Sequence, residues 1–270
     1  MPAGFSDIHC HLLPGIDDGA RDLTASLAMA RMAVADGTQT IIVTPHQLGN
    51  FAHNRGDDIR ARTAALQSDL DAAGIPLTIL PGGDVRIEEG MVAGLLAGDV
   101  MTLGDHGRHV LLELPHETYL PLEGLLAELK RHGIVGILSH PERNRGLLHA
   151  PELLPELVDG GCLMQVTAGS LVGTFGPDSQ QLGEWMVRQG LVHFIASDGH
   201  GPRNRRPLIR RAFERVAEWG GSAMAQATCC DFPARVAAGA DVPGGRLAPA
   251  PTESAHSGGW RRFFGLQRAA

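Results

Sequence analysis

The strongest constraint on the fold is a repeated alternation of short apolar runs with longer amphipathic segments. The runs have the length of buried strands, and the longer segments have helical periodicity, with glycine after several of them as at helix C-caps. This unit recurs about seven times, which predicts an α/β fold with a mostly parallel sheet; closure into a barrel fits the count better than an open sheet, although the pattern is compatible with both. The predicted strands are residues 7–11, 41–43, 77–80, 110–112, 135–138, 163–166 and 194–196, and the clearest predicted helices are 23–35, 59–73, 122–131 and 179–189.

The first predicted strand carries the most informative motif, D-I-H-C-H at residues 7–11. Because side chains alternate along a strand, we expect Asp7, His9 and His11 to share one face. Two imidazoles at one strand end, followed by carboxylates in the next loop, are suited to a divalent metal ion. A single H-x-H motif is weak evidence, so its weight depends on the residues at the ends of the later strands.

Histidines and acidic residues recur at the carboxyl ends of the later predicted strands. The steps from His9 through His46, Asp84, Glu113 and His140 are 37, 38, 29 and 27 residues, about one strand–helix unit each. In an α/β barrel these strand ends meet at one mouth, where such folds keep their active sites. We therefore predict one shared site, whose candidate metal ligands are His9, His11, Asp18, His46, Asp84, Glu113, His140, Asp198 and His200.

Five imidazoles and four carboxylates make up this candidate ligand set. Mixed nitrogen and oxygen ligation suits Mn²⁺, Fe²⁺ or Zn²⁺ better than Ca²⁺. The set is too large for one ion and carboxylates can bridge, so we expect two or three ions that together favour a phosphate monoester and activate water. At Asp18 the choice stays open, because Asp17 is adjacent and either carboxylate could instead cap a helix.

The composition argues against several other classes of protein. The net charge of −7 offers no basic field for nucleic acid, and no apolar run approaches the ~20 residues of a membrane span. There is no secretory signal pattern before Asp7, so we expect a soluble, cytoplasmic protein. We predict one domain over residues 1–232 and a flexible tail over 233–270; the basic-aromatic end of the tail, 260–266, either has no function or docks to a partner or an anionic membrane surface.

A cysteine-phosphatase spacing, C-x5-R, also occurs between Cys229 and Arg235. That mechanism needs backbone N–H groups that cradle phosphate around a thiolate of low pKa. Pro233 removes one such donor and Asp231 adds charge repulsion, so we expect a metal-based mechanism instead.

Six separated motifs, in order, resemble the polymerase-and-histidinol-phosphatase (PHP) superfamily. Within it they are similar to the bacterial metal-dependent tyrosine phosphatases of capsule and exopolysaccharide operons, over roughly residues 5–232. The motifs are D-I-H-C-H-x-L-P-G-I-D-D-G, T-P-H, L-L-E-L-P, S-H-P-E-R-N, Q-V-T-A-G-S at 165–170 with Phe175-Gly176 after it, and I-A-S-D-G-H.

This resemblance implies a distorted (β/α)7 barrel with a site of three metal ions, often Mn²⁺, with Fe²⁺, Zn²⁺ or Mg²⁺ as alternatives. It places His9, His11, Asp84 and Asp198 on one ion, Asp84, Glu113 and His140 on the second, and Asp18, His46 and His200 on the third. It also suggests Arg143 and Arg205 as phosphate binders, since guanidinium forks match phosphate oxygens. Arg203 and Arg206 are neighbours that make the second of these assignments less secure.

One residue departs from the family pattern, which usually has glutamate at the position of Asp84. Aspartate is one methylene shorter, so it either still bridges, with its loop moved inward, or binds one ion more weakly. Glu88 and Glu89 are less suitable replacements.

The resemblance further implies hydrolysis of phosphotyrosine on protein, with hydroxide attack in line at phosphorus and Asp198, His200 or water assisting proton transfer. A phenol, with a pKa of about 10, is an easier leaving group than a serine or threonine alkoxide. The implied substrate is the tyrosine-rich tail of a bacterial tyrosine autokinase that controls polysaccharide export. Two alternatives stay open: a small-molecule phosphatase of the histidinol-phosphate type, and a non-catalytic regulator that binds phosphotyrosine or a kinase.

Overall fold

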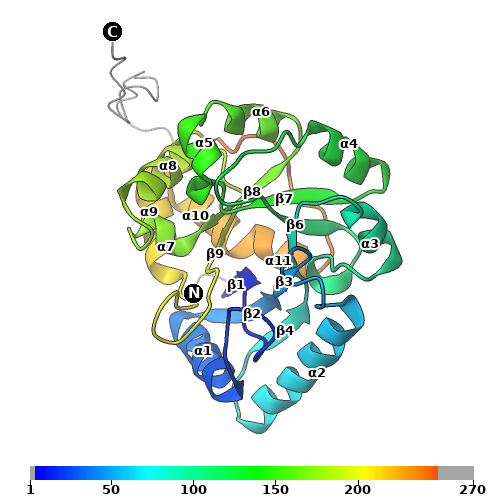
Figure 1. Ribbon diagram of the computed structural model, residues 1–270. Coiled ribbons are helices and arrows are strands. Elements are labelled where there is room, and N and C mark those ends of the chain that lie inside the picture. The colour runs from blue at the N-terminus through cyan, green and yellow to red at the C-terminus, as the bar shows by residue number, and fades with distance from the viewer. Residues whose placement is uncertain (1–3, 249–270) are drawn as a thin grey trace.

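Short parallel strands occupy the centre of the molecule, and helices surround them (Figure 1). The computed structural model describes residues 4–248. The strands pair into two sheets, in the orders β1-β2-β4 and β3-β5-β6-β7-β8-β9. Their bounds are β1 (Phe5–Cys10), β2 (Thr38–Val43), β3 (His46–Gln47), β4 (Thr78–Pro81), β5 (Asp84–Arg86), β6 (His109–Glu113), β7 (Val135–Ser139), β8 (Leu163–Thr167) and β9 (Phe194–Ala196).

The two sheets are parts of one distorted ring. β3 follows β2 after Thr44 and Pro45, and β5 follows β4 after two glycines, so each pair is one interrupted strand. The ring closes between β1 and the segment that follows β9. There, Asp198 N donates to His9 O at 2.7 Å, and His11 N donates to Gly199 O at 2.9 Å. Nine strands with two such interruptions give seven positions around the ring. The predicted distorted seven-stranded α/β barrel is therefore confirmed, and the interruptions are its distortion.

The predicted helices are also present, with boundaries that shift by a few residues. Asp22 caps the first of them, because its Oδ1 accepts from Ala25 N at 2.8 Å. The α-helices are α1 (Leu23–Asp36), α2 (Gly56–Ala72), α3 (Met91–Ala97), α4 (Glu123–Arg131), α5 (Arg145–His149), α6 (Leu153–Asp159), α7 (Ala168–Leu171), α8 (Pro177–Arg188), α9 (Arg210–Gly220), α10 (Ser222–Gln226) and α11 (Phe232–Ala237). The remaining helical elements of residues 4–248 are two 3-10 turns, η1 (Leu103–Asp105) and η2 (Pro141–Arg143), and a π-helical turn, η3 (Ala227–Asp231).

The barrel is filled by apolar side chains, most of which come from its own strands. These side chains are almost fully buried and form one cluster, which comprises Ile8, Ile42, Leu103, Leu111, Ile137, Leu163, Phe194, Ala196 and Val236. Val236 belongs to α11, which contacts β1 and lies near it at the centre of Figure 1.

Packed structure therefore extends past residue 232, where we predicted the domain to end. Val236 has no exposed surface, and Leu247 N donates to Gly190 O at 2.8 Å. The basic-aromatic segment 260–266 lies outside the described residues. Across residues 4–248, no helix is long and apolar enough to cross a membrane.

Truncation of Phe194 to alanine is expected to lower the free energy of unfolding by about 3–5 kcal/mol, because the buried ring leaves a cavity inside the barrel. Leu96→Ala is the matched control: Leu96 is 56% exposed, so its truncation should cost less than about 0.5 kcal/mol. Urea unfolding followed by circular dichroism measures both variants. Equal losses would contradict the central position of Phe194.

Candidate metal centre

The nine candidate ligands lie together at the carboxyl ends of the strands. They form four overlapping groups, in each of which the ligand atoms lie within 4.8 Å of one another. His9, His11, His46 and Asp84 each belong to two groups, so the groups join into one continuous site. The groups are His11–Asp18–His46–His200, His9–His11–Asp84, His9–His140–Asp198 and His46–Asp84–Glu113.

His9 is at the centre of this site. Its Nε2 lies 3.2 Å from His11 Nε2, 3.3 Å from Asp198 Oδ1 and 3.5 Å from Asp84 Oδ2. Its other nitrogen, Nδ1, lies 2.8 Å from Gln165 Oε1. Since the amide oxygen can only accept, Nδ1 carries a proton, and Nε2 is the nitrogen that faces the carboxylates. This is the orientation that a metal ligand requires.

Asp17 and Asp18 have different partners, which separates two residues that the sequence left as alternatives. Asp17 Oδ2 accepts from His11 Nδ1 at 2.7 Å and from His46 N at 3.1 Å, so it orients His11 from outside the ligand groups. Asp18 belongs to a ligand group. The loop that carries both residues returns close to His11: a side chain at Gly19 would lie 2.4 Å from His11 Cβ.

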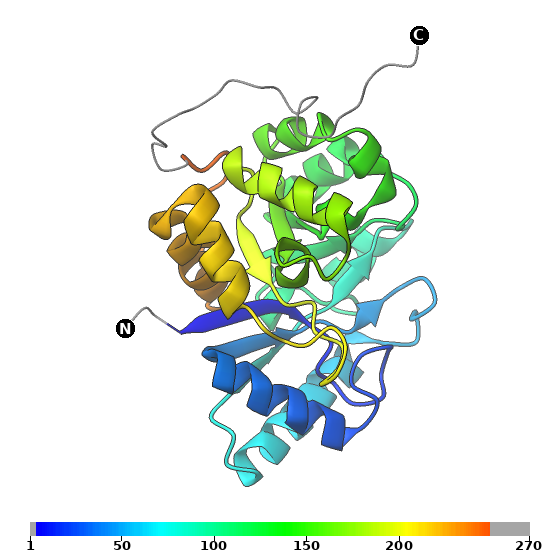
Figure 2. The same cartoon turned by 90° about the vertical axis from the view of Figure 1, so that its left-hand side faces the viewer.

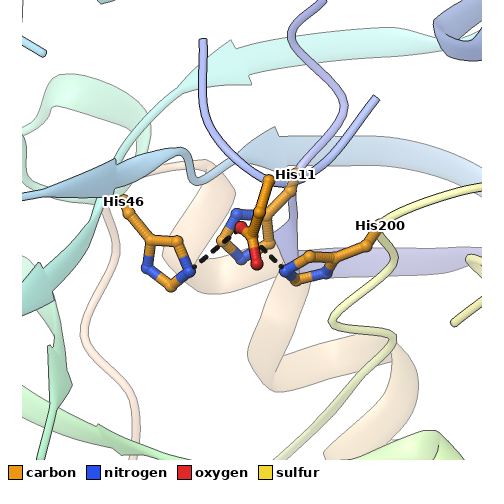
Figure 3. A group of neighbouring side chains, drawn as sticks. His11, His46 and His200 are labelled. Atoms are coloured by element: carbon orange, nitrogen blue, oxygen red, sulfur yellow. Dashed lines mark ion pairs between the residues drawn. The ribbon is translucent and has the colours of Figure 1, made fainter. Parts of the chain in front are cut away.

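His46 and His200 approach Asp18 from two sides. The Nε2 atoms of both rings lie 3.4 Å from Asp18 Oδ1. Figure 3 shows these two ion pairs as dashed lines, with His11 behind them. The ring of His11 lies 3.9 Å from that of His200 and 4.5 Å from that of His46, measured between centroids. Three imidazoles and a carboxylate therefore surround one small volume.

Asp84, the residue that departs from the family pattern, lies between two groups. Its Oδ2 is 3.5 Å from His9 Nε2 and 3.3 Å from His46 Nδ1. Glu113 Oε2 lies 3.5 Å from the same His46 nitrogen, and Glu113 Oε1 lies 4.0 Å from His140 Nε2. The shorter side chain thus still faces both sides of the site.

Several buried oxygens of the site have no hydrogen-bond donor within residues 4–248. Neither carboxylate oxygen of Asp84 has one there, nor does Asp198 Oδ1, and both residues are almost completely buried. Burying a carboxylate without compensation costs several kcal/mol, whereas coordination of a cation removes that cost. The donor set and these unpaired oxygens both fit divalent metal ions.

The charges of the site are strongly coupled. Burial would raise the pKa of Asp198, but His9, His11 and two arginines outweigh it and hold that pKa well below its usual range. Burial lowers the pKa of His9, yet Asp198 and Asp84 outweigh it and raise that pKa to about 9. Burial and Arg143 keep the pKa of His140 well below its usual range, so His140 is neutral at physiological pH. Asp198 and Asp84, whose pKa values are both lowered by their histidine neighbours, are ionised there and attract cations.

The backbone is strained at three positions of the site. His140, Asp198 and Arg205 have φ angles of 33°, 49° and 49°, in the left-handed region that favours glycine. Only Leu48 and Asp105 share this feature among the other non-glycine residues from 4 to 248. Such residues cost about 1–3 kcal/mol each and persist where the surrounding structure requires them, often at functional sites.

Arg143 and Arg205 converge on one oxygen of the site. Both guanidinium groups donate to Asp198 Oδ2, Arg205 at 2.5 Å. The ring of Phe175 lies 4.1 Å from the Arg143 guanidinium carbon and 5.8 Å from that of Arg205. Gly169 permits this packing, since a side chain there would lie 2.9 Å from the Phe175 ring. A pocket of about 460 Å³ opens beside Arg205, Asp18 and His200.

Some residues that shape the site were not among the predicted ones. Gln165, in the middle of β8, holds His9, and Phe175 packs against both arginines. Asp7 lies outside the four ligand groups although it shares a strand with His9; its Oδ1 accepts from Ser197 N at 3.0 Å and from His9 N at 3.2 Å. The spacing rule that located the histidines could have located Gln165, because β8 had no other candidate.

The cysteine-phosphatase spacing does not form a phosphate cradle. Cys229 is buried in η3, and burial raises the pKa of its thiol far above the usual value. Arg235 instead donates to the carbonyl oxygen of Asp241 at 2.5 Å. A protonated, buried thiol is not a nucleophile.

Comparison with known proteins identifies the family. The chain matches the family described as "Capsular polysaccharide synthesis, CpsB/CapC" over residues 5–238. The chain belongs to the CpsB/CapC family. This confirms the expected resemblance to the tyrosine phosphatases of capsule operons.

Relatives within the CpsB/CapC family carry the names of enzymes. The chain is 38% identical over 201 residues to tyrosine-protein phosphatase YwqE of Bacillus subtilis, across 74% of this chain and 78% of YwqE. It is 25% identical over 236 residues to tyrosine-protein phosphatase CpsB of Streptococcus pneumoniae, across 85% and 97%. A solved structure from work on YwqE and CpsB, described as unique metal-dependent tyrosine phosphatases, superposes with a TM-score of 0.85 at 32% identity and covers 92% of this chain and all of its own.

A more distant structure shows the fold alone. The phosphotriesterase homology protein from Escherichia coli superposes with a TM-score of 0.55 at 12% identity, across 87% of this chain and 99% of its own.

Replacement of Asp17 by asparagine is expected to weaken Mn²⁺ binding about 10- to 100-fold, because a carboxylate no longer orients His11. Asp22→Asn is the matched control, since Asp22 caps α1 outside the ligand groups and asparagine caps equally well. Isothermal titration calorimetry of the metal-stripped protein measures both. Unchanged affinity in Asp17→Asn would contradict an orienting role for this carboxylate.

Proposed function

We propose that this protein is a metal-dependent phosphatase that hydrolyses phosphotyrosine on protein and uses no cysteine nucleophile. One observation carries the proposal: nine metal-type ligands and two arginines meet at the mouth of the barrel. The names of the family and of its relatives supply the substrate class.

The inferred metal assignment follows the expectation from the family. His9, His11, Asp84 and Asp198 would hold one ion, Asp84, Glu113 and His140 a second, and Asp18, His46 and His200 a third. The proximity groups support shared ligands, although they place His140 beside His9 and Asp198 as well as near Glu113. We infer two to three ions, which nitrogen and oxygen donors fit, and Mn²⁺ as the metal because the family resemblance implies it, with Fe²⁺, Zn²⁺ or Mg²⁺ as alternatives.

When bound, divalent ions would lower the pKa of water and polarise the phosphoryl group. The protein's own side chains would do the rest. Arg143 and Arg205 would bind phosphoryl oxygens, for which they already point into the site through Asp198. Phe175 would hold the guanidinium planes in place.

The reaction would need less help with proton transfer than with binding of the phosphoryl group. Phenolate, with a pKa of about 10, leaves more easily than an alkoxide, so strong proton donation is unnecessary. Asp198 or His200 would assist where a proton is needed. His200 Nδ1 lies 3.0 Å from the carbonyl oxygen of Asp198, so it donates there and its Nε2 faces Asp18 and the site.

The inferred partner is the phosphotyrosine-bearing tail of a bacterial tyrosine kinase that controls capsule or exopolysaccharide synthesis. The family description and the named relatives support this inference. Such a tail would meet the enzyme in the cytoplasm, which remains our predicted location.

With Mn²⁺, the protein should hydrolyse a phosphotyrosine peptide, and His140→Ala should lower kcat/KM at least about 100-fold because a ligand is lost. His132→Ala is the matched control, since this histidine is exposed at the end of α4. Phosphate release is measured for the peptide and for histidinol phosphate. Preference for histidinol phosphate would favour the small-molecule alternative, and turnover of neither would favour a non-catalytic regulator.

Chelation and thiol chemistry should have opposite effects on turnover. EDTA is expected to abolish activity and Mn²⁺ to restore it, whereas iodoacetamide should leave activity intact because all four cysteines are buried. Cys229→Ser should retain most activity. If Cys229→Ser folds normally but loses turnover, the result would support the cysteine mechanism.

A further inference from the structure

A second pocket lies beside the metal centre and is rich in arginine. Its volume is about 400 Å³. Its walls come from the segment after β8, from the loop between β9 and α9, and from the first turn of α9. In Figure 2 this loop is the yellow segment that runs from β9 past the end of β1. We name it the arginine pocket for Arg203, Arg205, Arg206 and Arg211, which line it; no aspartate or glutamate belongs to its described lining.

Three of these arginines carry an uncompensated charge. Within residues 4–248, Arg203, Arg206 and Arg211 have no carboxylate oxygen within 4.0 Å, whereas Arg205 pairs with Asp198. Elsewhere on the same helix, Arg215 pairs with Glu218 at 2.8 Å. The chain as a whole has a net charge of −7, so this local excess of positive charge is opposite in sign to the charge of the whole chain. Like charges gathered around one hollow repel one another, and an anion within it would relieve that repulsion.

The arginine pocket is continuous with the metal centre. Arg205 lines the pocket, and its Nη2 also donates to Asp198 Oδ2 at 2.5 Å. Phe175 lines the pocket as well and contacts the guanidinium groups of Arg143 and Arg205. A peptide whose phosphotyrosine is held by those two arginines would therefore pass along the pocket.

The loop that carries the arginines has a defined shape. His200 N donates to Arg205 O at 2.8 Å, which closes the turn, and Leu208 N donates to Arg206 O at 2.9 Å. Ile209 N donates to Asp36 Oδ2 at 2.6 Å, which ties the end of the loop to α1. Arg203 and Arg206 thus flank an Arg205 whose own position is set by Asp198.

We propose that the arginine pocket binds a second anionic side chain of the substrate, a carboxylate or a phosphate close in sequence to the phosphotyrosine. Guanidinium forks bind both groups by paired hydrogen bonds. Because Arg205 belongs to both places and an extended peptide advances about 3.3–3.6 Å per residue, we expect this second side chain within about three residues of the phosphotyrosine. This inference rests on the proposed function, and it narrows the substrate class to acidic or multiply phosphorylated peptides.

Peptide binding to the Mn²⁺-loaded protein tests the proposal directly. The probes carry a non-hydrolysable phosphonate analogue of phosphotyrosine, with neutral flanks, with one glutamate at each flanking position in turn, or with one phosphoserine. Two exposed ion pairs are worth a modest gain, so the best anionic peptide should bind about fivefold more tightly than the neutral one. The glutamate and phosphoserine probes distinguish a carboxylate from a phosphate as the preferred group.

Two variants separate the pocket from general charge effects. In R206A/R211A, the ratio of the two dissociation constants should fall to about one. Arg215→Ala removes an exposed arginine from the same helix outside the pocket, so the ratio should stay near fivefold. Circular dichroism confirms that both variants fold.

Two results would overturn the proposal: equal binding of neutral and anionic peptides to the unaltered protein, or a preference that survives in R206A/R211A. Turnover of the matching phosphotyrosine peptides is measured in parallel. Equal binding with normal turnover would reject the arginine pocket and leave the proposed function intact. If the unaltered protein prefers the anionic peptide about fivefold but turns over none of the peptides, the arginine pocket stands and the phosphatase activity is rejected.

Discussion

Hydrogen bonds between β1 and the segment after β9 join the first and last strands of the barrel, and the metal centre depends on them. Asp198 N and His11 N exchange bonds with His9 O and Gly199 O, and Asp7 adds its side chain to Ser197 N. These contacts join residues that are almost 190 positions apart in the chain. They also bring the H-x-H motif of the first strand against the D-x-H motif after the last, so closure of the fold and assembly of the site are one event.

Electrostatics explains why such a site needs so many supporting residues. Ionised carboxylates and imidazoles are buried together, which is costly unless each charge has a partner. Gln165 and Asp17 hold the outer nitrogens of His9 and His11, so that the inner nitrogens face the carboxylates. Left-handed backbone at His140 and Asp198 aims two further groups at the same volume. The protein thus concentrates strain and charge where a cation can balance both.

The arrangement of the side chains also distinguishes between the two phosphatase mechanisms, metal-based and cysteine-based, for which the sequence contains motifs. Cys229 and Arg235 have a suggestive spacing but lie in a buried π-helical turn whose thiol is protonated. The nine metal-type ligands, spread over most of the chain, converge instead. The spacing of two residues within one segment was therefore a weaker guide to the active site than the recurrence of ligand residues at the ends of successive strands. Only that recurrence reflects where a residue lies in the barrel.

The sequence by itself determined the strand–helix alternation, the mostly parallel sheet and the identity of the residues at the strand ends, since these follow from local periodicity and the parallel connections it requires. It also placed Asp84 in the site despite the missing methylene. Only the tertiary structure decided that the strands close into a ring and that Asp17 orients His11 while Asp18 faces His46 and His200. It also decided that chain packing continues past residue 232, and that three arginines without a carboxylate partner in residues 4–248 share a pocket. These features depend on contacts between distant segments and on side-chain direction, neither of which local periodicity encodes.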